Sequence, residues 1–147
     1  MYNILKHAHS GLRWVALALL VFVVINALRK WLSKTDTFTE GDRKLNVFTL
    51  ISVHVQVLIG LALFFISDKV SFGGDMMSNK LLRFFTMEHT LAMLIAAVLV
   101  TIGNARSKKA ATATAKFKTT FIFYAIALVL ILMMIPWPSK GFGTGWF

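Results

Sequence analysis

Long uncharged apolar blocks alternate with short charged connections along the chain. Residues 45–67 and 119–139 contain no Asp, Glu, Lys or Arg, and residues 84–105 contain Glu88 as their single charge. The apolar side chains fill these blocks on all sides, whereas a soluble helix would carry one apolar stripe. A helix needs about 20 mostly apolar residues to cross a bilayer, so each block predicts a membrane-spanning helix.

The first block, residues 14–28, is shorter and reaches spanning length only with the near-neutral residues 7–12 before it. No small-residue cleavage site follows its apolar part, so we expect it to be retained as a helix and not removed as a signal peptide. Four helices are therefore predicted near residues 8–31, 44–67, 81–104 and 119–137. Short connections make sequence neighbours antiparallel. The prediction is an all-α, integral membrane, up-down-up-down four-helix bundle, with residues 1–147 as a single transmembrane domain.

Positive charge gathers at one end of this predicted bundle. Of the 16 Lys and Arg residues, ten lie in the first and third connections and six on the opposite side. The positive-inside rule then places both termini outside the cytoplasm, which means the periplasm for a protein of a bacterial inner membrane. The net charge of +10 gathers at helix ends, a pattern typical of contact with lipid headgroups and not with nucleic acid.

The chain has no cysteine, which excludes disulfides, thiolate metal sites, iron–sulfur clusters and covalently attached haem. It also has no nucleophile–base pair, phosphate-binding loop or paired catalytic carboxylates, so an electron carrier or a subunit is favoured over a stand-alone enzyme. Pro136 and Pro138 are predicted to close the last helix. The glycine-rich residues 141–147 predict a flexible tail.

Ionisable side chains inside the blocks are the main functional signal. They cost about 2.5–3.5 kcal/mol each on insertion scales, and they therefore mark candidate sites. The first helix contributes His9 and Arg13, the second His54, and the third Glu88 and His89. The simplest role for Glu88 and Arg13 is a charge pair inside the bundle, and Glu88 is also a candidate proton carrier.

Neutral imidazole is a common axial ligand of haem iron, and helix bundles hold cofactors between facing helices. Arg13 and Arg83 lie near the outer end, where they could pair with the propionates. Met93 shares the predicted face of His89 and offers a soft contact. His9 and His89 match in height, whereas His54 lies deeper, so the spacing leaves open which two of the three histidines are the axial ligands.

At these residues the chain resembles a family of small four-helix membrane proteins from Bacteroidetes that carry the label cytochrome B. The matching stretches are residues 7–14 (HAHSGLRW), 54–60 (HVQVLIG), 83–93 (RFFTMEHTLAM), 135–138 (IPWP) and 143–147 (GTGWF). Thr144 stands where the family has a basic residue. The resemblance implies haem b and electron transfer, with His9, His54 and His89 as the family's histidines and no defined substrate. Because the fourth helix has no histidine, one haem is expected.

Three hypotheses follow. The first is a haem b protein that relays electrons, with quinone as the candidate membrane-borne partner. The second is a zinc or copper protein that binds or transports the metal through His9, His54, His89 and Glu88. The third is an accessory subunit of a larger membrane complex, whose histidines hydrogen-bond helices together.

Overall fold

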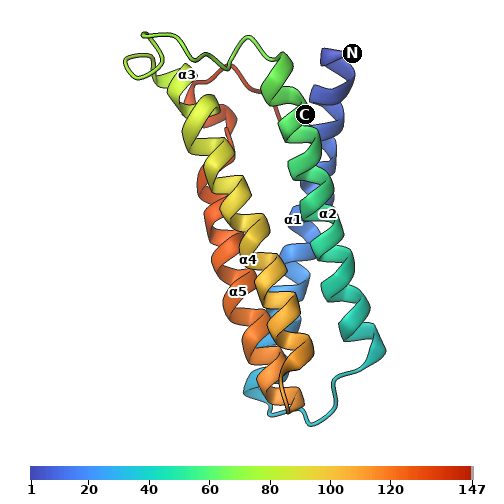
Figure 1. The fold of residues 1–147 in the computed structure, drawn as a ribbon. Coiled ribbons are helices and arrows are strands. Elements are labelled where there is room, and N and C mark those ends of the chain that lie inside the picture. Colours follow the sequence, from blue (N-terminus) through green and yellow to red (C-terminus); the bar gives the residue numbers. More distant parts are fainter. Residues whose placement is uncertain (147) are drawn as a thin grey trace.

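The computed structural model describes residues 1–146 and contains only helices and connections in that part of the chain. Four of its helical segments are long enough and apolar enough to span a membrane. The all-α four-helix bundle predicted from the sequence is confirmed (Figure 1). The helical elements are α1 (Tyr2–Leu32), α2 (Glu40–Ile66), α3 (Lys80–Arg83), the π-helix η1 (Phe84–Glu88), α4 (His89–Lys109), α5 (Ala113–Met134) and the short 3₁₀-helix η2 (Pro138–Lys140).

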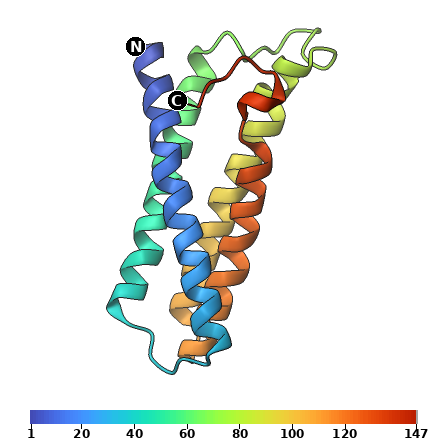
Figure 2. The ribbon, with the colours of Figure 1, turned by 180° about the vertical axis from the view of Figure 1, so that it is seen from behind.

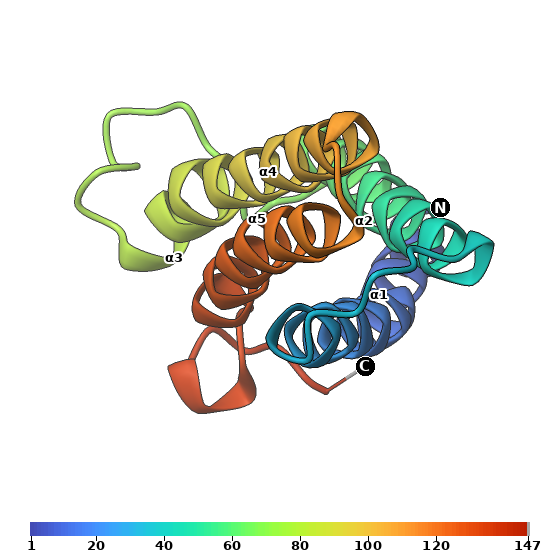
Figure 3. The same cartoon turned by 90° about the horizontal axis from the view of Figure 1, so that it is seen from below.

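The four long helices form a ring in which α1 contacts α2, α2 contacts α4, α4 contacts α5 and α5 contacts α1. Seen along the bundle, they enclose a common interior (Figure 3). The N-terminus and Trp146, whose carbonyl accepts from Arg13 of α1, lie at the same end of the bundle, as four crossings require (Figure 1). Large apolar side chains such as Phe22, Leu58 and Ile126 are exposed on the outer faces. A continuous apolar exterior of this kind suits lipid as the solvent, so the chain is a multi-pass membrane protein.

The helices are longer than the apolar blocks that predicted them. The first begins at Tyr2 instead of residue 8, and α2 begins at Glu40 because Thr39 and Asp42 form a capping box. The Asp42 carboxylate also accepts hydrogen bonds from Lys30 Nζ at 2.6 Å and Asn26 Nδ2 at 3.0 Å. The end of the bundle opposite the termini is therefore held by a buried acidic side chain that joins α1 to α2.

The third span is one helix by hydropathy, but a π-helical turn interrupts it just before His89. The Thr90 hydroxyl donates to the Phe85 carbonyl, five residues earlier, at 2.9 Å. Arg83 and Glu88, also five residues apart, form an ion pair at 2.9 Å. The spacing of five residues is that of a π-helix, and such turns are frequent at functional sites.

Close packing joins α4 to α5. A Cβ on Gly103 would lie only 2.5 Å from the Cβ of Phe123 on α5, and the small residues Ala92 and Ala96 are also buried on α4. Small residues at such positions let membrane helices approach one another closely. The fully buried Tyr124 on α5 donates its hydroxyl hydrogen to the Asn46 carbonyl of α2 at 3.0 Å.

The chain after α5 folds back across the bundle, and part of the predicted tail packs against it. Phe142 is buried and stacks on Phe84 with ring centroids 4.4 Å apart, and the Thr144 hydroxyl donates to the Pro136 carbonyl at 2.5 Å. Figure 2 shows this segment crossing between α1 and α5, which separate toward the end that carries both termini. The segment therefore covers that end of the bundle interior.

Candidate functional site

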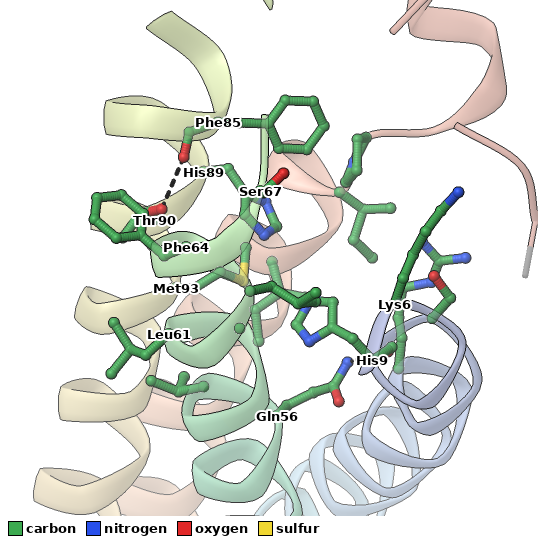
Figure 4. A pocket seen from close by; sticks show the side chains of 18 of the residues that line it. Lys6, His9, Gln56, Leu61, Phe64, Ser67, Phe85, His89, Thr90 and Met93 are labelled. Carbon is green, nitrogen blue, oxygen red and sulfur yellow. Dashed lines mark hydrogen bonds between the residues drawn. The ribbon is translucent and has the colours of Figure 1, made fainter. Parts of the chain in front are cut away.

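A cavity of about 180 Å³ lies inside the bundle near the end that holds the two termini. All four long helices and the C-terminal segment contribute to its wall (Figure 4). Its deeper part is apolar, with side chains such as Leu17, Val53, Val57 and Ile131. A partly open apolar cavity with a few polar side chains is a usual form of a cofactor site.

His9 from α1 and His89 from α4 point into this cavity from opposite walls (Figure 4). Their ring centroids are 6.4 Å apart and their planes are inclined at 79°. His89 Nδ1 donates to the Met134 carbonyl at 2.8 Å, so its Nε2 is the nitrogen with a lone pair. The Nδ1 atom of His9 is buried without a hydrogen-bond partner in the described chain. Of the three predicted histidines, the structure brings His9 and His89 together at the cavity.

Two residues of α2 hold His9 in place. The Gln56 side-chain amide donates to the His9 backbone carbonyl at 2.6 Å. Gly60 lies directly against the ring, since a Cβ at that position would be 3.2 Å from His9 Cε1. Gly60 therefore makes room for the imidazole, which is a reason for glycine at a helix-interior position that otherwise disfavours it.

His54, the third predicted ligand, does not line the cavity. Its Nδ1 donates to the Leu50 carbonyl at 2.8 Å. Its Nε2 lies 3.1 Å from the Thr101 hydroxyl on α4, whose single hydrogen is shared between this nitrogen and the Ala97 carbonyl at 2.8 Å. It lies six residues before Gly60 in the sequence, or about 9 Å along the helix axis. Because both ring nitrogens lie within hydrogen-bond distance of polar groups, one of them on α4, the geometry gives His54 the role of a link between α2 and α4.

The predicted charge partners are also rearranged. Glu88 is exposed and binds Arg83 at 2.9 Å, so it does not pair with Arg13. The Arg83 guanidinium also donates to the Met77 carbonyl at 3.1 Å. Neither Arg83 nor Glu88 lines the cavity. A spacing of five residues does not share a face in an α-helix, and the pair forms because the π-helical turn intervenes.

Arg13 does line the cavity, as does Met93. One terminal nitrogen of the Arg13 guanidinium donates to the Trp146 carbonyl at 2.5 Å, and the guanidinium carbon lies 5.3 Å from the ring centroid of Trp14 and 5.9 Å from that of Trp137. Its Nε is buried without a hydrogen-bond partner in the described residues. Arg13 thus offers one N–H group for a further acceptor.

Sequence reasoning missed two cations at the cavity, Lys6 and Lys69. Lys6 precedes His9 by three residues, so the helical spacing could have placed it on the same side of α1. Lys69 lies in the loop after α2, where its ammonium group donates to the Phe142 carbonyl at 3.3 Å, and no helical periodicity extends to that position. With Arg13 they make the outer part of the cavity cationic.

Comparison with known proteins adds no relative. The chain matches no family model, no curated protein and no solved structure. The resemblance to the cytochrome B family therefore stays a prediction, and function has to be argued from the site.

The separation of the two rings is compatible with one metal ion held by both imidazoles. An ion bound about 2 Å from one nitrogen of each ring holds the ring centroids about 6 Å apart, since each nitrogen lies about 1 Å from its ring centre. The observed separation is 6.4 Å. The described residues contain no group of three or more His, Cys, Asp or Glu side chains that could hold a metal ion. A two-imidazole site matches haem iron, whose other four ligands come from the porphyrin.

The cavity is smaller than a typical cofactor pocket. Cofactor pockets measure about 300–1,000 Å³, whereas this cavity measures about 180 Å³. A porphyrin therefore requires the wall to open. Phe64 and Met93 line the wall and have side chains that can rotate, and Met93 is a residue type that adapts readily to its neighbours.

Proposed function

We propose that this chain is a membrane haem b protein that relays single electrons, with His9 and His89 as the axial ligands of one haem. The observation that carries the proposal is the pair of rings from two helices, 6.4 Å apart across an apolar cavity. A buried imidazole nitrogen with no hydrogen-bond partner, such as Nδ1 of His9, is costly unless it serves a ligand.

The cationic part of the cavity suits the two carboxylates of haem. Arg13, Lys6 and Lys69 line it, and the Arg13 Nε has no acceptor in the described chain. Charge-assisted hydrogen bonds from such groups to carboxylates are about twice as strong as neutral ones. We therefore assign the propionate-binding role to these three residues and withdraw it from Arg83, which binds Glu88.

When bound, haem supplies a centre that gains and loses one electron. The chain's own residues hold it and control its surroundings: the apolar helices exclude water, and the C-terminal segment covers the outer end. A donor or acceptor dissolved in the bilayer, such as a quinone, fits a carrier enclosed in lipid. The excess of Lys and Arg at the end opposite the termini supports an orientation with both termini outside the cytoplasm, which is the periplasm for the bacterial inner membrane that we propose.

A reduced-minus-oxidised absorption spectrum of the purified protein tests the proposal. The wild-type chain, or the chain reconstituted with haemin, is expected to show the bands of a low-spin b-type haem with two imidazole ligands. His9→Ala and His89→Ala are each expected to abolish that spectrum. His7→Ala is the matched control, because His7 is exposed on the same helix and does not line the cavity. A wild-type chain without haem bands after reconstitution would refute the proposal.

The zinc or copper hypothesis receives less support, because the structure separates His54 and Glu88 from the other two predicted ligands. Elemental analysis distinguishes the cases. Iron together with porphyrin supports haem, whereas stoichiometric zinc or copper without porphyrin supports the metal site. The helix-linking role of histidine in the accessory-subunit hypothesis suits His54, whose two nitrogens lie near the Leu50 carbonyl of α2 and the Thr101 hydroxyl of α4.

A further inference from the structure

The end of α5 has an unusual arrangement of hydrogen bonds. The last carbonyls of an α-helix receive no hydrogen bond from within the helix, so they accept hydrogen bonds from donors outside it. Here side chains supply them: Trp137 Nε1 donates to the Leu132 carbonyl at 2.9 Å, and the Lys140 ammonium donates to the Met133 carbonyl. The carbonyl that follows these two in the sequence belongs to Met134, and its partner lies on another helix.

Two prolines leave the Met134 carbonyl free of backbone donors. Pro136 disfavours the α conformation of the residue before it, and Ile135 indeed has ψ 132°, which ends the helix. In a continued helix the donor to Met134 would be the backbone N–H of residue 138, but that residue is Pro138, which has none. Each proline alone is enough to keep a backbone N–H away from the Met134 carbonyl.

His89 uses the carbonyl that the prolines leave free. Its Nδ1 lies 2.8 Å from the Met134 oxygen. A carbonyl oxygen can only accept, so Nδ1 carries the hydrogen and Nε2 carries the lone pair. This hydrogen bond also fixes the ring in orientation at the cavity wall, opposite His9.

We propose that Pro136 and Pro138 are positioning residues for His89: by reserving the Met134 carbonyl, they hold the imidazole in the Nδ1–H tautomer and present Nε2 as a ligand atom. The inference rests on the proposed function for its purpose, because a hydrogen bond to the distal nitrogen makes an imidazole a stronger and better-oriented metal ligand. The tautomer itself is a property of the chain without haem. It can therefore be measured whether or not haem binds.

The test is the ¹⁵N NMR spectrum of histidine side chains in the full-length haem-free protein in detergent, at a pH at which the rings are neutral. The His89 signals are assigned by their loss in His89→Gln. In the wild type, His89 is expected to show a protonated Nδ1 and an unprotonated Nε2. In the double variant Pro136→Ala/Pro138→Ala, residue 138 can donate to Met134. A carbonyl oxygen has two lone pairs, so this donor weakens the bond from His89 without replacing it. The ratio of Nδ1–H to Nε2–H tautomer of His89 should then fall, by at most about fivefold, which is the full value of one hydrogen bond of ordinary strength.

Controls within the same spectra separate this effect from general damage. The Nδ1 of His54 donates to the carbonyl of Leu50 in its own helix, so His54 should keep the Nδ1–H tautomer in every variant. Pro136→Ala and Pro138→Ala alone should leave the His89 ratio unchanged, because one proline remains in each. A wild-type His89 in the Nε2–H form, or a double variant with the wild-type ratio, would overturn the proposal. Single variants that change as much as the double would overturn it as well.

Discussion

Replacing Gly60 with alanine should weaken haem binding by displacing the His9 ring. The added Cβ would lie 3.2 Å from His9 Cε1, whereas ordinary contacts begin at 3.4 Å and extend to 4 Å. The ring must therefore move by at least 0.2 Å, the difference between 3.2 and 3.4 Å. Ligand side chains need to stay within about 0.5 Å of their working geometry, so this displacement takes up much of the tolerance of the site.

The size of the effect follows from the cost of turning the ring away from its preferred rotamer. A rotation of about 30° costs about 0.5–1.5 kcal/mol, which corresponds to about a 2- to 10-fold loss of affinity. Gly60→Leu overfills the same space, which costs about 1–3 kcal/mol and should weaken binding by about 5- to 150-fold. Alanine favours helix over glycine by about 1 kcal/mol, so Gly60→Ala should not lower the thermal stability of the fold.

Titration of the haem-free protein with haemin, followed by the Soret absorbance, measures the affinity. Gly11→Ala is the matched control: it makes the same substitution on α1, two residues after His9, where a Cβ meets nothing within 4 Å. Equal affinities for Gly60→Ala and Gly11→Ala would refute the reasoning. So would a loss of affinity in Gly60→Ala that only parallels a fall in its melting temperature.

Three further changes probe the bundle away from the ligand pair. Gly103→Ala should lower the melting temperature in detergent, because its Cβ would meet the Cβ of Phe123 at 2.5 Å and overpacking costs about 1–3 kcal/mol; an unchanged melting temperature would contradict the close approach of α4 and α5. Tyr124→Phe removes the hydroxyl bound to the Asn46 carbonyl and should destabilise the fold by about 0.6 kcal/mol, measured by unfolding in mixed detergents, with no shift in haem absorbance. Glu88→Gln should leave the haem spectrum unchanged, because this carboxylate lies outside the cavity. A shifted spectrum would show that Glu88 affects the haem and would contradict this placement.

Hydropathy alone predicted the four spans, and the reason is local. A bilayer selects each helix for length and apolar composition, and both can be read along the chain without knowing its neighbours. The exact ends of the helices were harder to predict from the sequence. The first turns of α1 and α2 continue beyond the apolar blocks, and in α2 the capping box of Thr39 and Asp42 decides the start.

The site was only partly visible in the sequence. His9, His89, Arg13 and Met93 line the cavity as the pattern suggested, but His54 and Arg83 do not. Helical spacing assumes an unbroken α-helix, and the π-helical turn before His89 changes which residues of the third span meet.

For His54, the nearby Leu50 carbonyl and Thr101 hydroxyl supply partners that composition cannot reveal. An ionisable residue in an apolar block therefore indicates that its polar atoms have a hydrogen-bond partner or a ligand. Only the tertiary structure identifies that partner.

By itself the sequence determined that the chain crosses a membrane as four helices, that its cations gather at the ends, and that thiol chemistry is excluded. Only the tertiary structure decided that His9 and His89 face each other, that Gly60 makes room for one ring, and that the C-terminal segment covers the cavity. The physical reason is that lipid solvation acts on each helix separately. Convergence of side chains depends instead on how helices rotate and pack against one another, and on turns and chain ends that no periodic pattern describes.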